Sequence, residues 1–78
     1  MSKQDIHWHL DSTVWQRAFL GGPPAMAEIW VADDGGVGWA VFAPSGPDEV
    51  AYAAEQGTGA DEADAKAQAE AALRRVAR

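Results

Sequence analysis

The chain has 78 residues, no cysteine, and twelve Asp and Glu against six Lys and Arg, which gives a formal net charge of −6. This length fits one domain, and a hydrophobic share of 47% predicts that the domain folds. The acidity argues against direct binding to nucleic acid, and the lack of Cys excludes a disulfide framework or a thiolate metal site. The polar N-terminus and the absence of a long apolar run predict a cytoplasmic protein with no membrane contact.

The first 24 residues predict strands and a loop. Residues 6–10 alternate apolar and polar side chains, which favours a strand, while residues 11–13 suit either a turn or a helix cap. Whether residues 6–20 form one strand, two strands or a short helix stays open at this point. Residues 14–20 alternate again, and one side of this second strand carries Trp15, Arg17 and Phe19. Gly21–Pro24 then predicts a loop, because proline cannot donate to a β-ladder.

Residues 25–32 and 37–43 flank Asp33-Asp34-Gly35-Gly36, a strong signal for a β-hairpin. A loop of two or of four residues pairs Ala32 with Val37. That register predicts one face that carries Met26, Trp30, Trp39 and Val41. It predicts an opposite face that carries Ala27, Ile29, Val31, Gly38, Ala40 and Phe42.

The remaining residues predict a turn, a strand and a helix. Residues 44–49 form the turn, residues 50–55 the strand with Tyr52, and residues 56–60 a Gly-rich connection. The helix runs from Asp61 to about Ala77, with Asp61 as N-cap, Asp64 as its capping-box partner, and basic residues in the last turn. Its apolar stripe comprises Ala65, Ala69, Ala72, Leu73 and Val76.

These elements predict an α+β fold of a single domain, residues 1–78. A small antiparallel β-sheet of three to five strands, spanning about residues 6–56, forms a meander, and one C-terminal amphipathic α-helix at about residues 61–77 packs on one face. We expect the alanine stripe of the helix to pack against Gly38 and Ala40. The face with Trp30 and Trp39 is then left without a helix.

Signatures of catalysis, metals and nucleotides are weak. His7 and His9 share a strand face, but no third ligand accompanies them. The Gly-rich segments 35–38 and 57–59 lack the lysine of a phosphate loop, and the carboxylate pairs 33–34 and 48–49 lie in expected exposed turns. We therefore expect no enzyme activity, no metal and no cofactor.

Two surface features are the candidates for function. In a meander the helix begins near the Asp33-Asp34 turn, which predicts an acidic end, while Arg74, Arg75 and Arg78 reach the other end near Asp48 and Glu49. The candidate partner-binding residues are Glu28, Trp30, Asp33, Asp34, Trp39, Asp61, Glu62 and Asp64. The alternatives are that the acidic end is only a helix N-terminus beside a polar turn, or that the N-terminal segment covers the Trp face. A homodimer through the Trp face is a third alternative.

The pattern Trp30…Asp34-Gly35…Trp39-Ala40-Val41…Gly57…Glu62-Ala63…Lys66…Ala69-Glu70-Ala71-Ala72-Leu73 resembles small proteins of phages and mobile elements. Among them, anti-CRISPR proteins bind a CRISPR-Cas effector subunit, in some cases as DNA mimics. The resemblance implies a non-enzymatic protein-binding inhibitor that blocks a nucleic-acid-binding surface on a basic partner. The alternatives are a HicB-like antitoxin that neutralises a small RNase toxin, although the usual Pro-Gly run and DNA-binding segment are missing, or a structural or virion protein.

Overall fold

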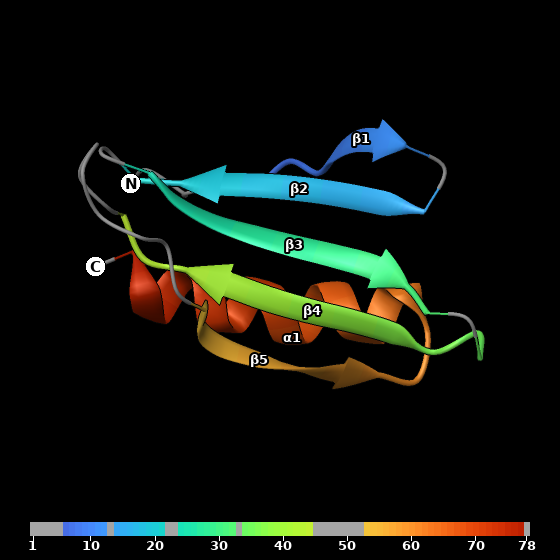
Figure 1. The fold of residues 1–78 in the computed structure, drawn as a ribbon. Coiled ribbons are helices and arrows are strands. Elements are labelled where there is room, and N and C mark those ends of the chain that lie inside the picture. The colour runs from blue at the N-terminus through green and yellow to red at the C-terminus, as the bar shows by residue number, and fades with distance from the viewer. Residues whose placement is uncertain (1–5, 13, 22–23, 33, 45–52, 78) are drawn as a thin grey trace.

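The computed structural model describes residues 6–12, 14–21, 24–32, 34–44 and 53–77, which form a five-stranded antiparallel meander and one helix (Figure 1). The strand order in the sheet is β1-β2-β3-β4-β5. The elements are β1 (His9–Ser12), β2 (Trp15–Leu20), β3 (Ala25–Val31), β4 (Val37–Phe42), β5 (Ala53–Gly59) and α1 (Glu62–Val76). The α+β fold expected from the sequence is confirmed. No helix in these ranges is both long and apolar enough to cross a bilayer.

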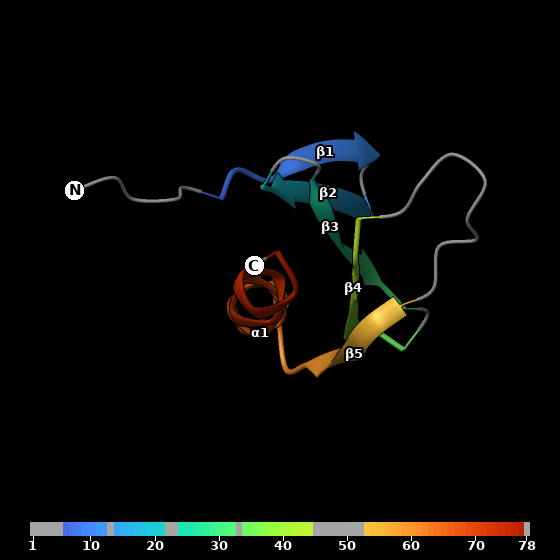
Figure 2. The same cartoon turned by 90° about the vertical axis from the view of Figure 1, so that its left-hand side faces the viewer.

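The helix α1 begins and packs as its sequence predicts. The Asp61 carboxylate accepts a hydrogen bond from the Asp64 N–H at 2.8 Å, so Asp61 is the N-cap. In a standard capping box, the third helix residue accepts a hydrogen bond from the N–H of the N-cap residue. Here the Asp64 carboxylate accepts instead from the N–H of Ala60, one residue before the N-cap, at 2.8 Å. Four residues of the predicted stripe are buried: Ala65, Ala69, Ala72 and Leu73. Figure 2 shows α1 on a single side of the sheet.

The register of the β3–β4 hairpin differs by one residue from the expectation. Val31, not Ala32, pairs with Val37. The Ala32 N–H donates to the Gly36 carbonyl at 2.8 Å, and Gly35 has a φ of +86° and donates its N–H to the Ala32 carbonyl at 2.9 Å. These bonds are typical of an odd-length hairpin loop that ends in a left-handed glycine. A shift of one residue moves every side chain of β4 to the opposite face, so the predicted face assignment of β4 is wrong.

The prediction that the helix packs against Gly38 and Ala40 of β4 is therefore wrong as well. Trp39 and Val41 lie in the core beneath α1, together with Ile29 and Leu73. The whole buried cluster comprises Ala18, Leu20, Ala25, Ala27, Ile29, Val37, Trp39, Val41, Ala65, Ala69, Ala72 and Leu73. The face assignments of β2 and of Ala27 and Ile29 in β3 are confirmed.

Two strands lie at other positions than predicted. The first strand covers His9–Ser12 rather than residues 6–10, so Asp11 and Ser12 belong to a strand and not to a turn or cap. The last strand continues through residues 56–59, which were expected to be a connection. A Cβ at Gly57 would lie 2.9 Å from the Trp39 ring, and one at Gly59 would lie 2.5 Å from the Ala65 backbone nitrogen. These glycines therefore permit close packing within a strand, and residues 50–52, including Tyr52, lie outside the described residues.

Candidate functional site

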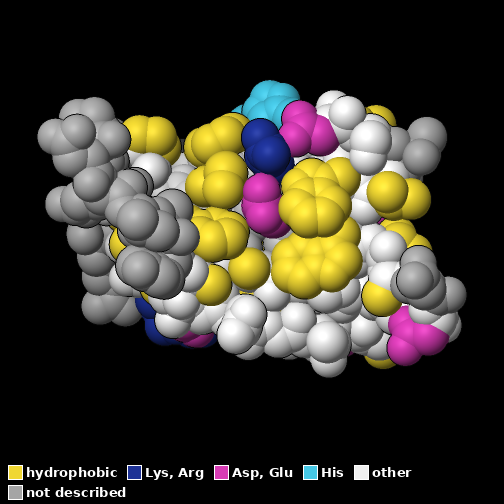
Figure 3. Space-filling view, viewed as in Figure 1, with side chains coloured by type: hydrophobic (Ala, Val, Ile, Leu, Met, Phe, Trp, Pro, Cys, Tyr) yellow, Lys and Arg dark blue, Asp and Glu magenta, His cyan; other side chains and the backbone are white. Residues whose placement is uncertain are grey.

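The side of the sheet opposite α1 has no covering element among the described residues. We call this side the open face. Figure 3 shows hydrophobic side chains on this face, on either side of a small group of charged ones. By strand alternation and register, its residues are Trp15, Arg17, Phe19, Met26, Glu28, Trp30, Gly38, Ala40, Phe42, Gln56 and Thr58.

The centre of the open face holds a stacked tryptophan pair. Trp15 and Trp30 are directly opposite each other on β2 and β3, and their ring centroids lie 5.5 Å apart with an interplanar angle of 21°. Gly38 pairs with Trp30 on the other side, where an added Cβ would lie 2.6 Å from the indole ring. The indole of Trp30 therefore lies flat across β4, and a residue with a side chain at position 38 would displace it. The stack is an aromatic platform in which both rings are partly buried and partly exposed.

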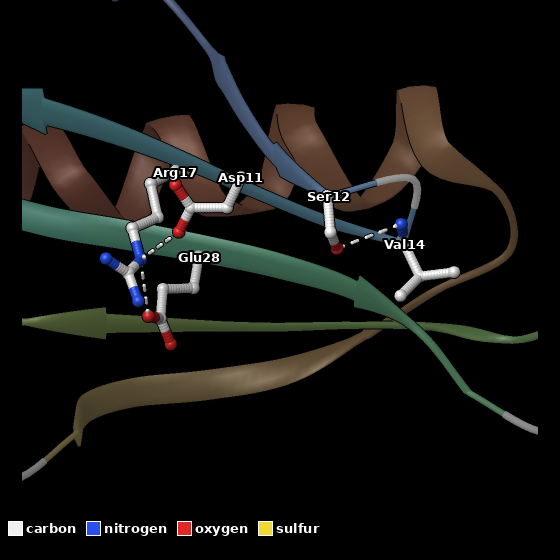
Figure 4. A network of polar contacts seen from close by, with 5 residues as sticks. All are labelled: Asp11, Ser12, Val14, Arg17 and Glu28. Carbon is white, nitrogen blue, oxygen red and sulfur yellow. Dashed lines mark hydrogen bonds and ion pairs between the residues drawn. The ribbon is translucent and has the colours of Figure 1, made fainter.

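A small charge network lies beside this platform (Figure 4). The Arg17 Nε lies 3.0 Å from an Asp11 carboxylate oxygen and 3.1 Å from a Glu28 carboxylate oxygen. Glu28 is only 9% exposed, and Arg17 is the cation that pairs with its carboxylate. With one cation and two carboxylates, the network keeps a formal charge of −1 on an otherwise apolar surface.

A shallow groove of about 560 Å³ crosses the hairpin end of the open face. Trp30 lines it on one side, and Gln56 and Thr58 of β5 line it on the other. Its lining reaches Asp34, whose carboxylate accepts a hydrogen bond from the Gly36 N–H at 2.9 Å. The groove therefore connects the aromatic platform to the acidic end of the molecule.

Four of the five residues predicted for the acidic end lie in the described ranges: Asp34, Asp61, Glu62 and Asp64. The β3–β4 turn and the start of α1 lie at the same end of the sheet, because Val37 pairs with Gly59 (Figure 1). Asp61 and Asp64 cap the helix, and Glu62 lies 2.9 Å from the Lys66 ammonium group. The hydrogen bond from Lys66, followed by one from Gln16, lowers the pKa of Glu62. Asp33 lies outside the described residues.

Cations do not compensate this end fully. Each Lys and Arg side chain of the described ranges lies within 4.0 Å of a carboxylate, and five ion pairs form among these residues. Within the same ranges, the carboxylates that lack such a cation are Asp34, Asp61 and Asp64. All three are exposed and lie at the acidic end. At the opposite end, Arg75 donates to Glu55 at 2.6 Å, a bond that lowers the pKa of Glu55 and raises that of Arg75.

Trp39, predicted to belong to this site, lies on the other side of the sheet. Its side chain is only 7% exposed, and its indole N–H donates to the Gln68 side-chain oxygen at 3.0 Å. The one-residue shift of the β3–β4 register explains the difference. The prediction that Trp30 and Trp39 share a face is therefore wrong, and Trp15 takes the place of Trp39 beside Trp30.

The N-terminal segment lies on the helix side rather than across the open face. Ile6 and Trp8 pack against the core under α1, and the Trp8 indole N–H donates to Glu70 at 2.8 Å. The ammonium group of Lys66 lies 5.8 Å from the centroid of the Trp8 ring. The alternative in which this segment covers the tryptophans is therefore wrong for residues 6–12.

Several residues of the open face were not predicted as site residues. Phe19 is 46% exposed, and Met26 and Phe42 pair with each other across β3 and β4. Alternation within residues 14–20 had already placed Trp15, Arg17 and Phe19 on one side. The sequence pattern does not show how β2 pairs with β3. That pairing places these three residues on the same face as Trp30 and Glu28.

The described residues hold no group of three or more His, Asp or Glu side chains arranged to bind a metal ion. The chemistry that the open face offers is noncovalent: aromatic and aliphatic contact, one compensated charge network, and nearby carboxylates. Comparison of the chain with protein-family models, with curated proteins and with solved structures finds no match.

Proposed function

We propose that this chain is a non-enzymatic protein-binding module that docks a partner protein on the open face. The observation that carries the proposal is the Trp15–Trp30 platform. It shares the open face with Phe19, Met26 and Phe42, which lie beyond the Arg17–Glu28 pair, and no element among the described residues covers this face. Aromatic residues and Met are enriched at protein interfaces, and the aromatic rings supply large contact areas at low entropic cost. An exposed apolar surface of this kind is typical of an interaction site.

The charge distribution favours a partner with a basic surface. The net charge is −6, and the uncompensated carboxylates Asp34, Asp61 and Asp64 lie at the end that the groove reaches. Opposite charges speed association and align the two surfaces, with a dependence on salt. Within this class we propose an inhibitor of the anti-CRISPR type, which occupies a basic nucleic-acid-binding surface of a CRISPR-Cas effector subunit. That narrower proposal depends on the family resemblance and on the acidity.

A plating assay tests the narrower proposal. Bacteria with a CRISPR system that targets a phage are made to express this chain, and the plating efficiency of the phage is measured. An inhibitor restores plating by orders of magnitude, and co-purification then identifies the bound effector subunit. If plating stays low for every CRISPR type tested, the anti-CRISPR assignment is wrong.

A matched pair of variants tests the open face with any partner so identified. Phe19 on the open face is 46% exposed, and Val31, whose side chain lies on the other side of the sheet, is 45% exposed. Phe19→Ser should weaken binding at least tenfold, whereas Val31→Ser should leave it within about twofold. Equal effects of the two substitutions would contradict docking through the open face.

Charge-neutral variants that keep the local hydrogen bonds test the electrostatic contribution. Asp34→Asn keeps an acceptor for the Gly36 N–H, and Asp61→Asn keeps a good N-cap. The double variant should associate more slowly at low salt, while its dissociation rate should change little. An unchanged association rate would show that the acidic end takes no part in binding.

A further inference from the structure

The two edges of the sheet differ in how open they are to another strand. The edge strand β1 has four residues, and its pairing is interrupted by a register shift between Leu10 and Ser12. Short, irregular and charged edges are a common protection against strand addition. The other edge strand, β5, has seven residues and contains no Pro and no Lys. Its one charged residue, Glu55, is bound by Arg75.

The ladder shows which backbone groups of β5 point away from the sheet. The bond from Ala32 N–H to the Gly36 carbonyl makes these two residues a hydrogen-bonded pair next to Val31–Val37. Hydrogen-bonded and non-bonded pairs alternate along antiparallel strands, so Val37, Trp39 and Val41 direct their backbone groups toward β5. Their partners there are Gly59, Gly57 and Glu55. The N–H and C=O groups of Gln56 and Thr58 consequently point outward.

The space beside this edge suits an additional strand. Among the described residues, β5 pairs only with β4. Figure 2 shows α1 over the flat side of the sheet, with β5 at the margin. Gln56 and Thr58 are exposed and line the groove that also contains Trp30. An added strand would therefore place alternate side chains next to that groove and continue the open face.

We propose that the β5 edge binds an extended segment of a partner protein by antiparallel strand addition, with Lys or Arg N-terminal to the paired residues. The place of the basic residues follows from charge, because β5 ends at Gly59, at the same end as the uncompensated carboxylates Asp34, Asp61 and Asp64. The N-terminal flank of an antiparallel strand lies at that end. A net charge of −6 on each chain disfavours a second copy as the occupant. This inference deepens the proposed function and depends on it for the existence of a protein partner.

A designed peptide tests the edge directly. The probe has two lysines followed by alternating Thr and Val, and the control peptide has the same composition with both lysines at the C-terminus. Binding of the probe should slow amide exchange at Gln56 and Thr58 at least tenfold, because their N–H groups become hydrogen-bonded. The control peptide should bind at least tenfold more weakly. Equal affinities of the two peptides, or exchange that is unchanged at both amides, would overturn the proposal.

Two substitutions at one position separate the backbone from the side chain. Gln56→Pro removes an outward N–H but none of the bonds to β4, and proline is tolerated at such edge positions. Gln56→Val changes the side chain and keeps the N–H. The probe should bind Gln56→Pro at least tenfold more weakly and Gln56→Val within about twofold. If Gln56→Pro fails to fold, the amide exchange of the unmodified chain still decides.

The remaining outcomes distinguish this inference from the proposed function. A partner protein that no longer binds Phe19→Ser but still binds Gln56→Pro would support docking on the open face and overturn strand addition. A partner unaffected by both substitutions would contradict the proposed function as well. A concentration-dependent dimer that Gln56→Pro abolishes would assign the edge to a second copy and overturn the proposal of a partner segment.

Discussion

Alanine substitution of Trp39 and of Trp30 should have clearly different effects on stability, although both residues belong to the β3–β4 hairpin, nine positions apart in the sequence. Trp39 is 7% exposed, contacts the core under α1, and donates a hydrogen bond to Gln68. Trp30 is only partly buried and packs on Trp15 and Gly38 on the open face. Trp39→Ala therefore creates a cavity in the core, whereas Trp30→Ala removes a surface platform.

The expected magnitudes follow from burial. Truncating a buried Trp to Ala costs about 3–5 kcal/mol. Trp30→Ala loses the contacts of a partly buried ring and the aromatic stacking, together about 1–3 kcal/mol. A domain of this size has a free energy of unfolding of roughly 4–12 kcal/mol. The difference of about 2 kcal/mol between the variants corresponds to about 8–16 °C in melting temperature.

Urea unfolding followed by far-ultraviolet circular dichroism measures both variants, because the midpoint of the transition does not depend on the amplitude of the signal. Trp39→Ala should lower the midpoint far more than Trp30→Ala, with similar slopes if both remain two-state. Trp30→Ala should instead weaken binding of a partner. If the two substitutions destabilise equally, the tryptophans share one face, and the register in which Ile29 pairs with Trp39 is wrong.

Three further predictions concern single positions. Gly59→Ala should destabilise by about 1–3 kcal/mol in thermal unfolding, because its Cβ would meet the helix backbone, while Thr58→Ala should change little. Asp61→Ala should cost about 1 kcal/mol through loss of the N-cap, and Asp61→Asn should restore most of it. Glu55 has a folded-state pKa below 4.5, so its stabilisation is complete above about pH 4.5 and disappears as the pH falls through the folded pKa. The difference in stability between the wild-type chain and Glu55→Gln should therefore shrink on acidification below pH 4.5, and a difference that stays constant would contradict the ion pair with Arg75.

The sequence by itself determined the helix and the class of fold. An N-cap, acids in the first turn, Arg in the last turn and alanines at helical spacing all concern interactions within about four residues of each other, and these signals are local. Alternation placed Trp15, Arg17 and Phe19 on one side of a strand for the same reason. The Asp-Gly hairpin and the proline loop likewise marked where the chain reverses. The acidic end followed from the connectivity of a meander.

Only the tertiary structure decided which residues face each other. The sequence of residues 33–36 fits hairpin loops of more than one length. A change of one residue in loop length exchanges the two faces of β4. For this reason Trp39 lies in the core and Gly38 on the open face. The glycines at positions 57 and 59 indicated a loop because sequence patterns count glycine as a breaker. In the fold they are strand residues, required where the Trp39 ring and the backbone of α1 approach too closely for a side chain. The open face is thus a product of long-range pairing, which no local pattern in the sequence records.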